Sequence, residues 1–215
     1  MASRFTIDVP SPPEATTISD IHLAAMDNNL LTHAQFPTAP ALRFFHAWLE
    51  RNTAQHVRDA DKHVLVARDA ASRQVVSFVK WLVHAPGGGE SAARNLEGWS
   101  GRGAQHVLNA YAEMTARMRF DAMGTRGYYH VVFLCTAPQY TRQGAARLLM
   151  RRVQQRAAAD KMPVILESTM EGTALYTSLG FQAVRQLEMK LPARASHHAA
   201  EVYRELIMVW TGPAA

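Results

Sequence analysis

The spacing of apolar positions changes from segment to segment along the chain, and these changes separate helices from strands. Apolar residues three and four apart, as at Ile18, Ile21 and Ala25, predict an amphipathic helix. Short apolar or alternating runs predict strands instead. In the first part of the chain these patterns predict a strand at 4–9, helices at 16–27 and 40–52, and strands at 63–68 and 74–83 that form a β-hairpin.

A glycine-rich interruption separates this hairpin from the rest of the chain. Glycines at 87–89, 98, 101 and 103 predict an irregular loop after Pro86. A helix then ends before Gly124, with one apolar face formed by Val107, Tyr111, Met114 and Met118. We expect the stretch from about 84 to 127 to be an insertion. It either carries substrate recognition, as loops on rigid scaffolds often do, or is only a structural excursion.

The second half of the chain alternates strands and helices most regularly. Tyr128 to Thr136 is the strongest strand pattern, and the Ala-, Leu- and Arg-rich stretch from 144 to 159 is a strong helix. A strand at 164–168, a short helix at 172–179 and strands at 181–191 and 202–210 follow. This order predicts a mixed α/β protein, built as one domain over residues 1–215 around the strand-helix-strand unit at 128–168.

Composition and charge narrow the classes of ligand. The chain has 215 residues, 48% of them hydrophobic, which excludes a disordered protein. Its formal net charge of +5 favours anionic ligands, but no dense Lys/Arg run contains interspersed aromatic residues, so we expect a phosphate-bearing cofactor and no nucleic acid. The single cysteine, Cys135, excludes an internal disulfide and a Cys-based metal site, and we expect no metal. Without an apolar signal core or membrane span, we expect a cytoplasmic protein with no membrane partner.

The segment from Phe133 to Met150 carries the clearest chemical signal. A strand leads into a loop, and the loop leads into a helix whose first turn is rich in small residues around Gly144. The first amides of a helix lack intrahelical partners and lie at the positive end of its dipole, so a pyrophosphate would fit there. The segment is not a nucleotide P-loop, because no Gly-Lys-Ser/Thr follows, and it contains no G-x-G-x-x-G.

Two motifs resemble the GNAT superfamily of N-acetyltransferases. The sequence Thr-Arg-Gln-Gly-Ala-Ala at 141–146 is similar to the Gln/Arg-x-x-Gly-x-Gly/Ala core of the acetyl-CoA-binding motif, although Thr141 replaces its long polar first residue. Leu-Tyr-Thr-Ser-Leu-Gly-Phe at 175–181 is similar to a second family motif, in which an Asn often stands seven residues before the Tyr. This chain has Thr169 there. The chain most resembles uncharacterised GNAT proteins of filamentous fungi, which often carry an insertion before the central strand and an Ala-Asp pair like Ala159-Asp160.

The resemblance implies a GNAT fold with acetyl-CoA as co-substrate. The central mixed sheet would be splayed after Thr136, with helices on both faces. The pantetheine arm would lie in the splay, and the pyrophosphate would lie on the amides at 142–146. The residues expected to bind the cofactor are Leu134, Cys135, Thr136, Arg142, Gln143, Gly144, Ala145, Ala146, Arg147 and Thr169.

The resemblance also implies the reaction, which is transfer of an acetyl group to a primary amine of a small molecule by direct attack in a ternary complex. Tyr176 matches the general-acid position of the family, or else is a packed core tyrosine. His130, on the central strand, is a candidate for the base, because His titrates near neutral pH. Glu167, at the end of the next strand, is a rival candidate. Cys135 has no evident base partner, so we expect it to pack as a small apolar residue.

Several alternatives stay open at this point. The donor could carry a longer acyl chain, or the acceptor could be a protein. The altered Thr141 and Thr169 leave open a catalytically idle acyl-CoA-binding or scaffold protein. The sequence names neither the acceptor amine nor the oligomeric state.

Overall fold

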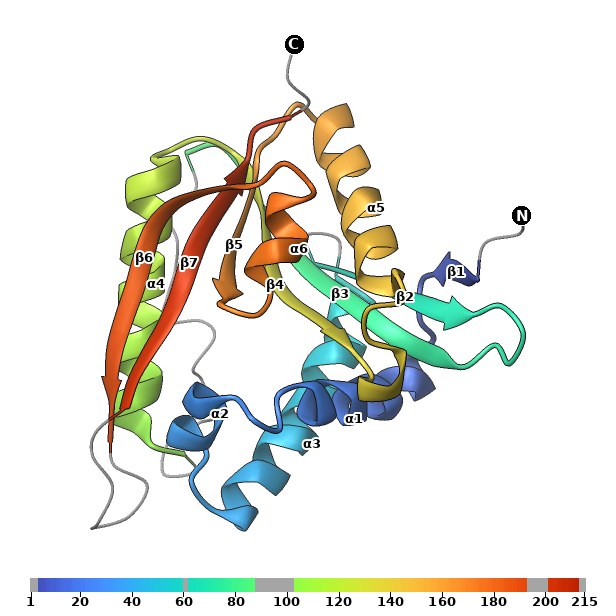
Figure 1. Ribbon diagram of the computed structural model, residues 1–215, viewed down its shortest axis with the longest axis horizontal. Helices are drawn as coiled ribbons and strands as arrows, with labels where there is room; N and C mark the ends of the chain where they lie inside the picture. Colours follow the sequence, from blue (N-terminus) through green and yellow to red (C-terminus); the bar gives the residue numbers. More distant parts are fainter. Residues whose placement is uncertain (1–3, 60–61, 88–102, 193–200, 213–215) are drawn as a thin grey trace.

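A single seven-stranded sheet forms the centre of the protein (Figure 1). The computed structural model describes residues 4–59, 62–87, 103–192 and 201–212. Along the sheet the strands follow the order β1-β2-β3-β4-β5-β7-β6, and only β4 and β5 are parallel. The strands are β1 (Phe5–Asp8), β2 (Lys62–Asp69), β3 (Val75–His84), β4 (Tyr128–Thr136), β5 (Val164–Thr169), β6 (Gln182–Leu191) and β7 (Glu201–Trp210).

Helices cover both faces of this sheet, as the family resemblance implies. The described helices are α1 (Ala15–Ala25), α2 (Leu30–Gln35), α3 (Ala39–His56), α4 (Gln105–Met123), α5 (Ala145–Ala159) and α6 (Thr173–Thr177). On one face, α5 presents residues spaced three and four apart, Leu149, Met150, Val153 and Ala157, which are fully buried against the sheet. The opposite face is covered by α1 and α4. The predicted α/β class and mixed sheet are therefore confirmed.

Several element boundaries differ from the prediction for local reasons. The sequence pattern missed α2, which is too short to show a helical periodicity and begins with Asn29 accepting the Thr32 amide. The helix predicted at 40–52 is longer, because Thr38 caps its start and it continues to His56. The short helix predicted at 172–179 is regular only over Thr173–Thr177.

The stretch from 84 to 127 contributes to the core through α4. Val107 and Leu108 are buried on this helix, and Val107 packs against Leu187 and Tyr203 of β6 and β7. Met123 at its end packs against Ile207 of β7. The predicted helix therefore covers the β6–β7 side of the sheet. Most of the predicted glycine-rich loop, residues 88–102, lies outside the described residues.

The sheet opens between its two parallel strands. β4 and β5 pair only where Tyr129, His130 and Val131 face Val164, Ile165 and Leu166. Beyond Val131 the strands separate toward their C-terminal ends (Figure 1), so the splay begins before Thr136 and not after it. A bulge in the β3–β4 pairing explains the difference, since Lys80 faces Phe133 while Trp81 faces Val131, which leaves Val132 as the extra residue. Such a bulge bends its strand and increases the local twist.

Candidate active site

The loop before α5 exposes a row of unpaired backbone amides. Arg142 and Gly144 have positive φ angles of 61° and 97°, and Gly144 is the N-cap of α5. Such an alternating backbone points successive N–H groups to one side and forms an anion-binding concavity. Within the described residues, the N–H groups from 142 to 147 donate no hydrogen bond. The loop therefore offers several adjacent donors at the positive end of a four-turn helix.

Local side chains hold this loop without covering its amides. The Thr141 hydroxyl donates to the Pro138 carbonyl at 2.9 Å, and Gln143 Nε2 donates to the Gln139 carbonyl at 3.0 Å. Arg147 Nη2 donates to Ser178 Oγ at 2.8 Å and so links the start of α5 to the end of α6. A Cβ on Gly144 would meet no atom within 4 Å, so the space above this residue is open.

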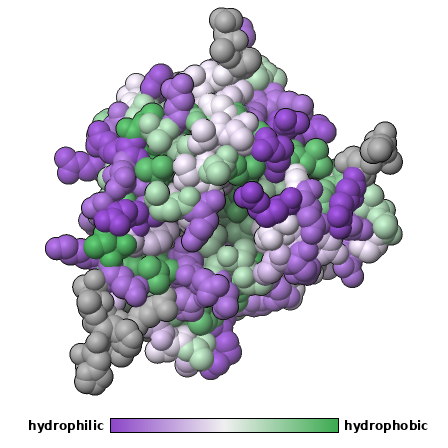
Figure 2. Space-filling view, in the orientation of Figure 1, coloured by the Kyte–Doolittle hydropathy of each residue, from purple (hydrophilic) through white to green (hydrophobic). Residues whose placement is uncertain are grey.

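The backbone of β4 from Leu134 to Thr136 lies beside this loop and along the splay. Its pairing partners on β3 are Val79, Phe78 and Ser77, while β5 pairs with none of the three residues. The edge of β4 that faces the splay is thus open to an extended ligand. Figure 2 shows polar side chains over most of this face, with paler and apolar surface nearer its centre.

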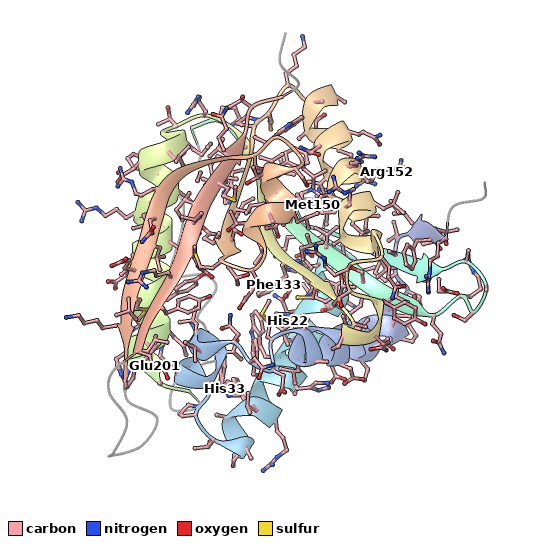
Figure 3. The ribbon with its side chains drawn as sticks, in the orientation of Figure 1. His22, His33, Phe133, Met150, Arg152 and Glu201 are labelled. Carbon is pink, nitrogen blue, oxygen red and sulfur yellow. The ribbon has the colours of Figure 1, made fainter. Side chains whose placement is uncertain are left out.

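The Cys135 side chain lies in the core. It is 2% exposed and packs in a cluster with Ile18 and Phe78 beneath α1. Burial raises the pKa of the thiol to about 12, so it stays a neutral thiol. On the same side, His22 and Phe133 point toward one another between α1 and β4, with ring centroids 4.5 Å apart (Figure 3). Only the backbone of Cys135 is therefore available to a ligand in the splay.

His130 and Glu167 form one unit, although the sequence presents them as rivals. They lie on β4 and β5, and His130 Nε2 is 2.9 Å from Glu167 Oε2. Arg119 of α4 donates to Glu167 Oε1 at 2.6 Å. Burial alone would raise the pKa of Glu167, but His130 and Arg119 together lower it to about 2. Glu167 is thus a fixed anion that orients the imidazole.

Tyr176 is buried with its ring packed in the core. Its ring is 8% exposed and packs edge-on against Phe181, with centroids 5.7 Å apart. Among the described residues nothing forms a hydrogen bond with the hydroxyl. Burial raises its pKa, with smaller contributions from Cys135 and Glu205, so the phenol stays protonated. A protonated donor of this kind suits a general acid.

Thr169 ends β5 and fixes the turn into α6. Its Oγ1 accepts the Gly172 amide at 3.3 Å, and its carbonyl accepts the Thr173 hydroxyl at the same distance. Across the sheet, Thr169 is paired with Glu205 of β7. The Thr169 side chain, at the position where the family often has an Asn, therefore stabilises the turn into α6.

A second buried polar group escaped the sequence analysis. Glu205 of β7 accepts the hydroxyls of Tyr111, from α4, and Tyr203. The available signal was a polar line on α4, where Tyr111, Thr115 and Arg119 stand four residues apart. No residue pattern around Glu205 in the sequence indicates that its carboxylate is buried and hydrogen-bonded.

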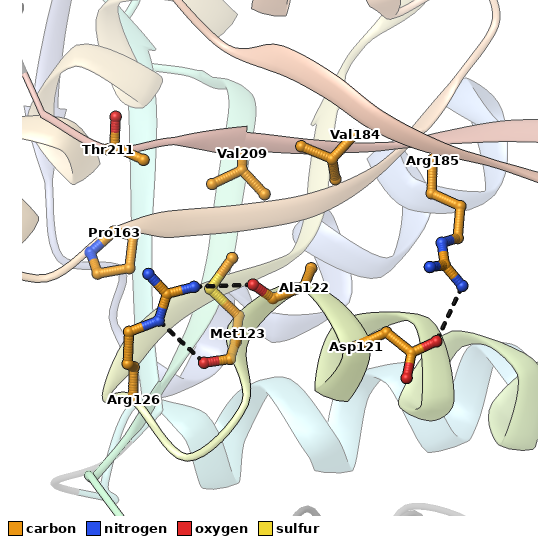
Figure 4. Close-up of a pocket in the computed structure, with 9 residues that line it drawn as sticks. All are labelled: Asp121, Ala122, Met123, Arg126, Pro163, Val184, Arg185, Val209 and Thr211. Carbon is orange, nitrogen blue, oxygen red and sulfur yellow. Dashed lines mark hydrogen bonds and ion pairs between the residues drawn. The ribbon is translucent and has the colours of Figure 1, made fainter.

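The pocket shown in Figure 4 belongs to another part of the molecule. It has a volume of about 330 Å³, and Asp121, Arg126, Pro163, Arg185 and Thr211 are among its lining residues. Pro163 precedes β5, so this pocket lies at the opposite ends of the parallel strands from the splay. None of the predicted site residues lines it.

The described ranges contain neither a metal-binding cluster nor a membrane-spanning helix. No group of three or more His, Cys, Asp or Glu side chains is placed there to hold a metal ion. None of the helices described combines the length and apolar character that crossing a bilayer requires.

Part of the chain matches a known protein family. Residues 107–190 match the family model of the acetyltransferase (GNAT) domain. No curated protein matches the chain. The fold is similar to a polyamine N-acetyltransferase of Drosophila melanogaster that catalyses formation of N-acetylagmatine, with 18% identity, a TM-score of 0.67, and 96% of this chain and 99% of that chain covered.

Two further solved structures show the same fold. A structure from Corynebacterium glutamicum, described as histone acetyltransferase HPA2 and related acetyltransferase, has 17% identity and a TM-score of 0.60, with 99% of this chain and 98% of that chain covered. Arabidopsis thaliana NAA60 in complex with acetyl-CoA has 16% identity and a TM-score of 0.54, with 96% and 97% covered.

The matched segment contains the main features of the site. It covers most of α4 and of β6, and all of β4, α5, β5 and α6. Acetyl-CoA, the co-substrate predicted from the sequence, is the one that GNAT acetyltransferases use. The closer resemblance to fungal proteins stays a prediction. Residues 107–190 thus match the acetyltransferase (GNAT) domain, and the whole chain has the fold of the solved acetyltransferases named above.

Proposed function

We propose that this protein transfers an acetyl group from acetyl-CoA to a primary amine of a small molecule. The observation that carries the proposal is the open edge of β4 beside the unpaired amides that precede α5. Polar backbone groups are rarely left unpaired unless water or a ligand satisfies them. A long ligand with an anionic centre and an amide-bearing arm would satisfy both sets of groups at once.

In this proposal the two parts of the site bind different parts of acetyl-CoA. The amides from Arg142 to Arg147 bind the pyrophosphate, and the Arg142 and Arg147 side chains add positive charge. The β4 backbone from Leu134 to Thr136 pairs with the pantetheine arm. Thr169 contributes through the turn that it holds beside the splay. Bound acetyl-CoA supplies the thioester whose carbonyl the amine attacks.

His130 and Tyr176 move the protons in this reaction. As the nitrogen–carbon bond forms and the carbon–sulfur bond breaks, the amine loses a proton and the sulfur gains one. Glu167 accepts the Nε2 proton of His130, which leaves Nδ1 as the proton acceptor of the ring. Glu167 is itself a poor base, because its pKa is about 2. Tyr176 donates its phenolic proton toward the departing sulfur.

Two observations favour a small amine as acceptor: the buried polar group of His130, Glu167 and Arg119 at the splay, and fold neighbours such as the N-acetylagmatine-forming enzyme. The neighbour described as a histone acetyltransferase keeps a protein acceptor as the alternative outcome. The deciding experiment incubates the purified protein with acetyl-CoA and a panel of amines, amino acids and peptides. Release of CoA thiol and the mass of each product are measured.

The proposal predicts CoA release that depends on a small amine, and a product heavier by one acetyl group. Replacing acetyl-CoA with a longer acyl-CoA tests the donor. Acetylation of peptides alone would favour a protein acceptor. Binding of acetyl-CoA without acetylation of any acceptor would indicate an acyl-CoA-binding protein instead.

A further inference from the structure

Glu205 is a carboxylate that the proposed reaction does not use. It lies on β7, is 5% exposed, and accepts the Tyr111 hydroxyl at 2.8 Å and the Tyr203 hydroxyl at 2.6 Å. Asn29, in the turn between α1 and α2, donates to the Tyr203 oxygen at 3.3 Å. Tyr111 of α4 and Tyr203 of β7 itself thus hold the carboxylate, and Asn29 holds Tyr203 in turn.

The two buried carboxylates of this region differ in their ion pairs. Glu167 has Arg119 and His130 as partners. Glu205 has only hydroxyl donors, and among the described residues no Lys, Arg or His forms an ion pair with it. Burying a carboxylate without a cation is costly, and two tyrosines compensate only part of that cost. The described residues thus supply no cation for the Glu205 carboxylate.

The position of Glu205 places it near the reaction centre but not at it. Thr169 faces Glu205 across the β5–β7 ladder, and Glu167 faces Ile207. Glu167 and Glu205 are thus diagonal neighbours on one face of the sheet, where such positions lie about 7–8 Å apart. Tyr176 packs on the other face of the sheet, with Leu166 and Met208, and Glu205 is among the groups that raise its pKa.

We infer that Glu205 is a specificity-determining residue that binds a positively charged group of the acceptor other than its reacting nitrogen. This inference rests on the proposed function. The favoured acceptors are consequently small amines with a second cationic group.

The chemistry of the attack explains why the cation must be a separate one. The reacting nitrogen needs a free lone pair, so it must be uncharged when it attacks. A carboxylate that held this nitrogen as an ammonium would stabilise the unreactive form and oppose the reaction. A second cation can keep its ion pair throughout. It would then orient the acceptor while His130 removes the proton from the nucleophile.

The electrostatics of Glu205 agree with this role. Burial and the nearby Glu167 raise the pKa of Glu205 to about 7, whereas the bonds from Tyr203 and Tyr111 lower it. A bound cation would favour the ionised form, because opposite charges stabilise each other in a buried site. The acceptor would thus bind to a carboxylate that is already positioned.

The test compares two acceptors and three variants. Diaminobutane carries a second amine and butylamine carries none, so their ratio of kcat/KM isolates the second cation. Glu205→Gln removes the charge with little change of shape, and Glu205→Asp keeps it. Glu188→Gln is the matched control, because Glu188 is exposed on β6 and pairs with Arg204 at 2.7 Å. Calorimetry measures binding of both amines to the CoA-bound protein, and of acetyl-CoA alone.

We expect wild type to prefer diaminobutane, and Glu205→Gln to lower that preference at least about tenfold at pH 8. Acetyl-CoA affinity should stay unchanged. Glu205→Asp should keep much of the preference, and Glu188→Gln all of it. An equal loss for both amines in Glu205→Gln would overturn the inference. The inference would also be overturned if the folded wild-type protein turned over both amines equally well, whatever the variants do. In that case the proposed function would survive. Selective binding of diaminobutane without acetyl transfer would refute the proposed function and keep the Glu205 site.

Discussion

Gly144 offers the sharpest test of the anion site, because the protein itself leaves room for a side chain there. Its φ of 97° lies in the left-handed region, and a Cβ would contact no atom within 4 Å. Gly144→Asp should therefore cost only the backbone strain of an L-residue, about 1–2 kcal/mol of unfolding free energy. The variant should fold.

The effect on acetyl-CoA should be larger than this strain suggests. A carboxylate about 4 Å from one phosphate charge is repelled by about 1 kcal/mol in water and about 4 kcal/mol near a protein surface. The loop is exposed, so we use the lower half of this range, about 1–2 kcal/mol per pair. The KM for acetyl-CoA should rise at least about 5- to 30-fold. The rise should shrink at high salt, because ions screen exposed charges.

Two controls separate the causes. Gly144→Ala adds the strain and the Cβ without the charge, and should raise the KM less. Gly124→Asp places the same carboxylate at the end of α4, where φ is also positive at 60° and a Cβ again meets no atom. KM is measured by thiol release, Kd by calorimetry and stability by thermal unfolding. A folded Gly144→Asp protein with unchanged KM and Kd at low salt would refute this placement of the pyrophosphate.

Three further variants test the proposed acid, the proposed base and the core. Tyr176→Phe should lower kcat and kcat/KM together by about 10²-fold or less, with acetyl-CoA affinity unchanged, because the lost proton donor acts mainly in the transition state; full kcat would make Tyr176 a core residue. His130→Ala should lower kcat most at the acidic end of the wild-type pH profile, and a profile of unchanged shape would assign the base to Glu167 or water. Burial, with a smaller effect of Lys80, lowers the pKa of His22 from 6.5 to about 3, so its contribution to stability is present above pH 6.5 and is lost as pH falls toward 3. Between pH 7 and about pH 5 the free energy of unfolding of the wild type should therefore fall by about 2 kcal/mol because of His22. Urea unfolding at both pH values should show that the free energy of His22→Leu falls by about 2 kcal/mol less than that of the wild type. An equal fall in both proteins would contradict this role of His22.

The sequence by itself determined the features that depend only on residues close together in the chain. The spacing of Leu149, Val153 and Ala157 defines the buried face of α5, since helical periodicity is a local property. Gly144 marks the helix start, because few other residues adopt its backbone angles easily. The order of strands and helices then sufficed to predict a mixed α/β protein, and the resemblance to a known family added the helices on both faces of the sheet.

Only the tertiary structure decided which polar residues act together. His130 and Glu167 are 37 residues apart and meet because β4 and β5 are parallel in one particular register. Tyr111 and Glu205 are 94 residues apart and meet where α4 packs over β7. The splay likewise begins at Val131 because of a bulge against a different strand. A shift of one residue in register would turn each of these strand side chains to the other face of the sheet. Strand register depends on partners distant in the chain, so the local pattern contains the residues of the site but not their pairing.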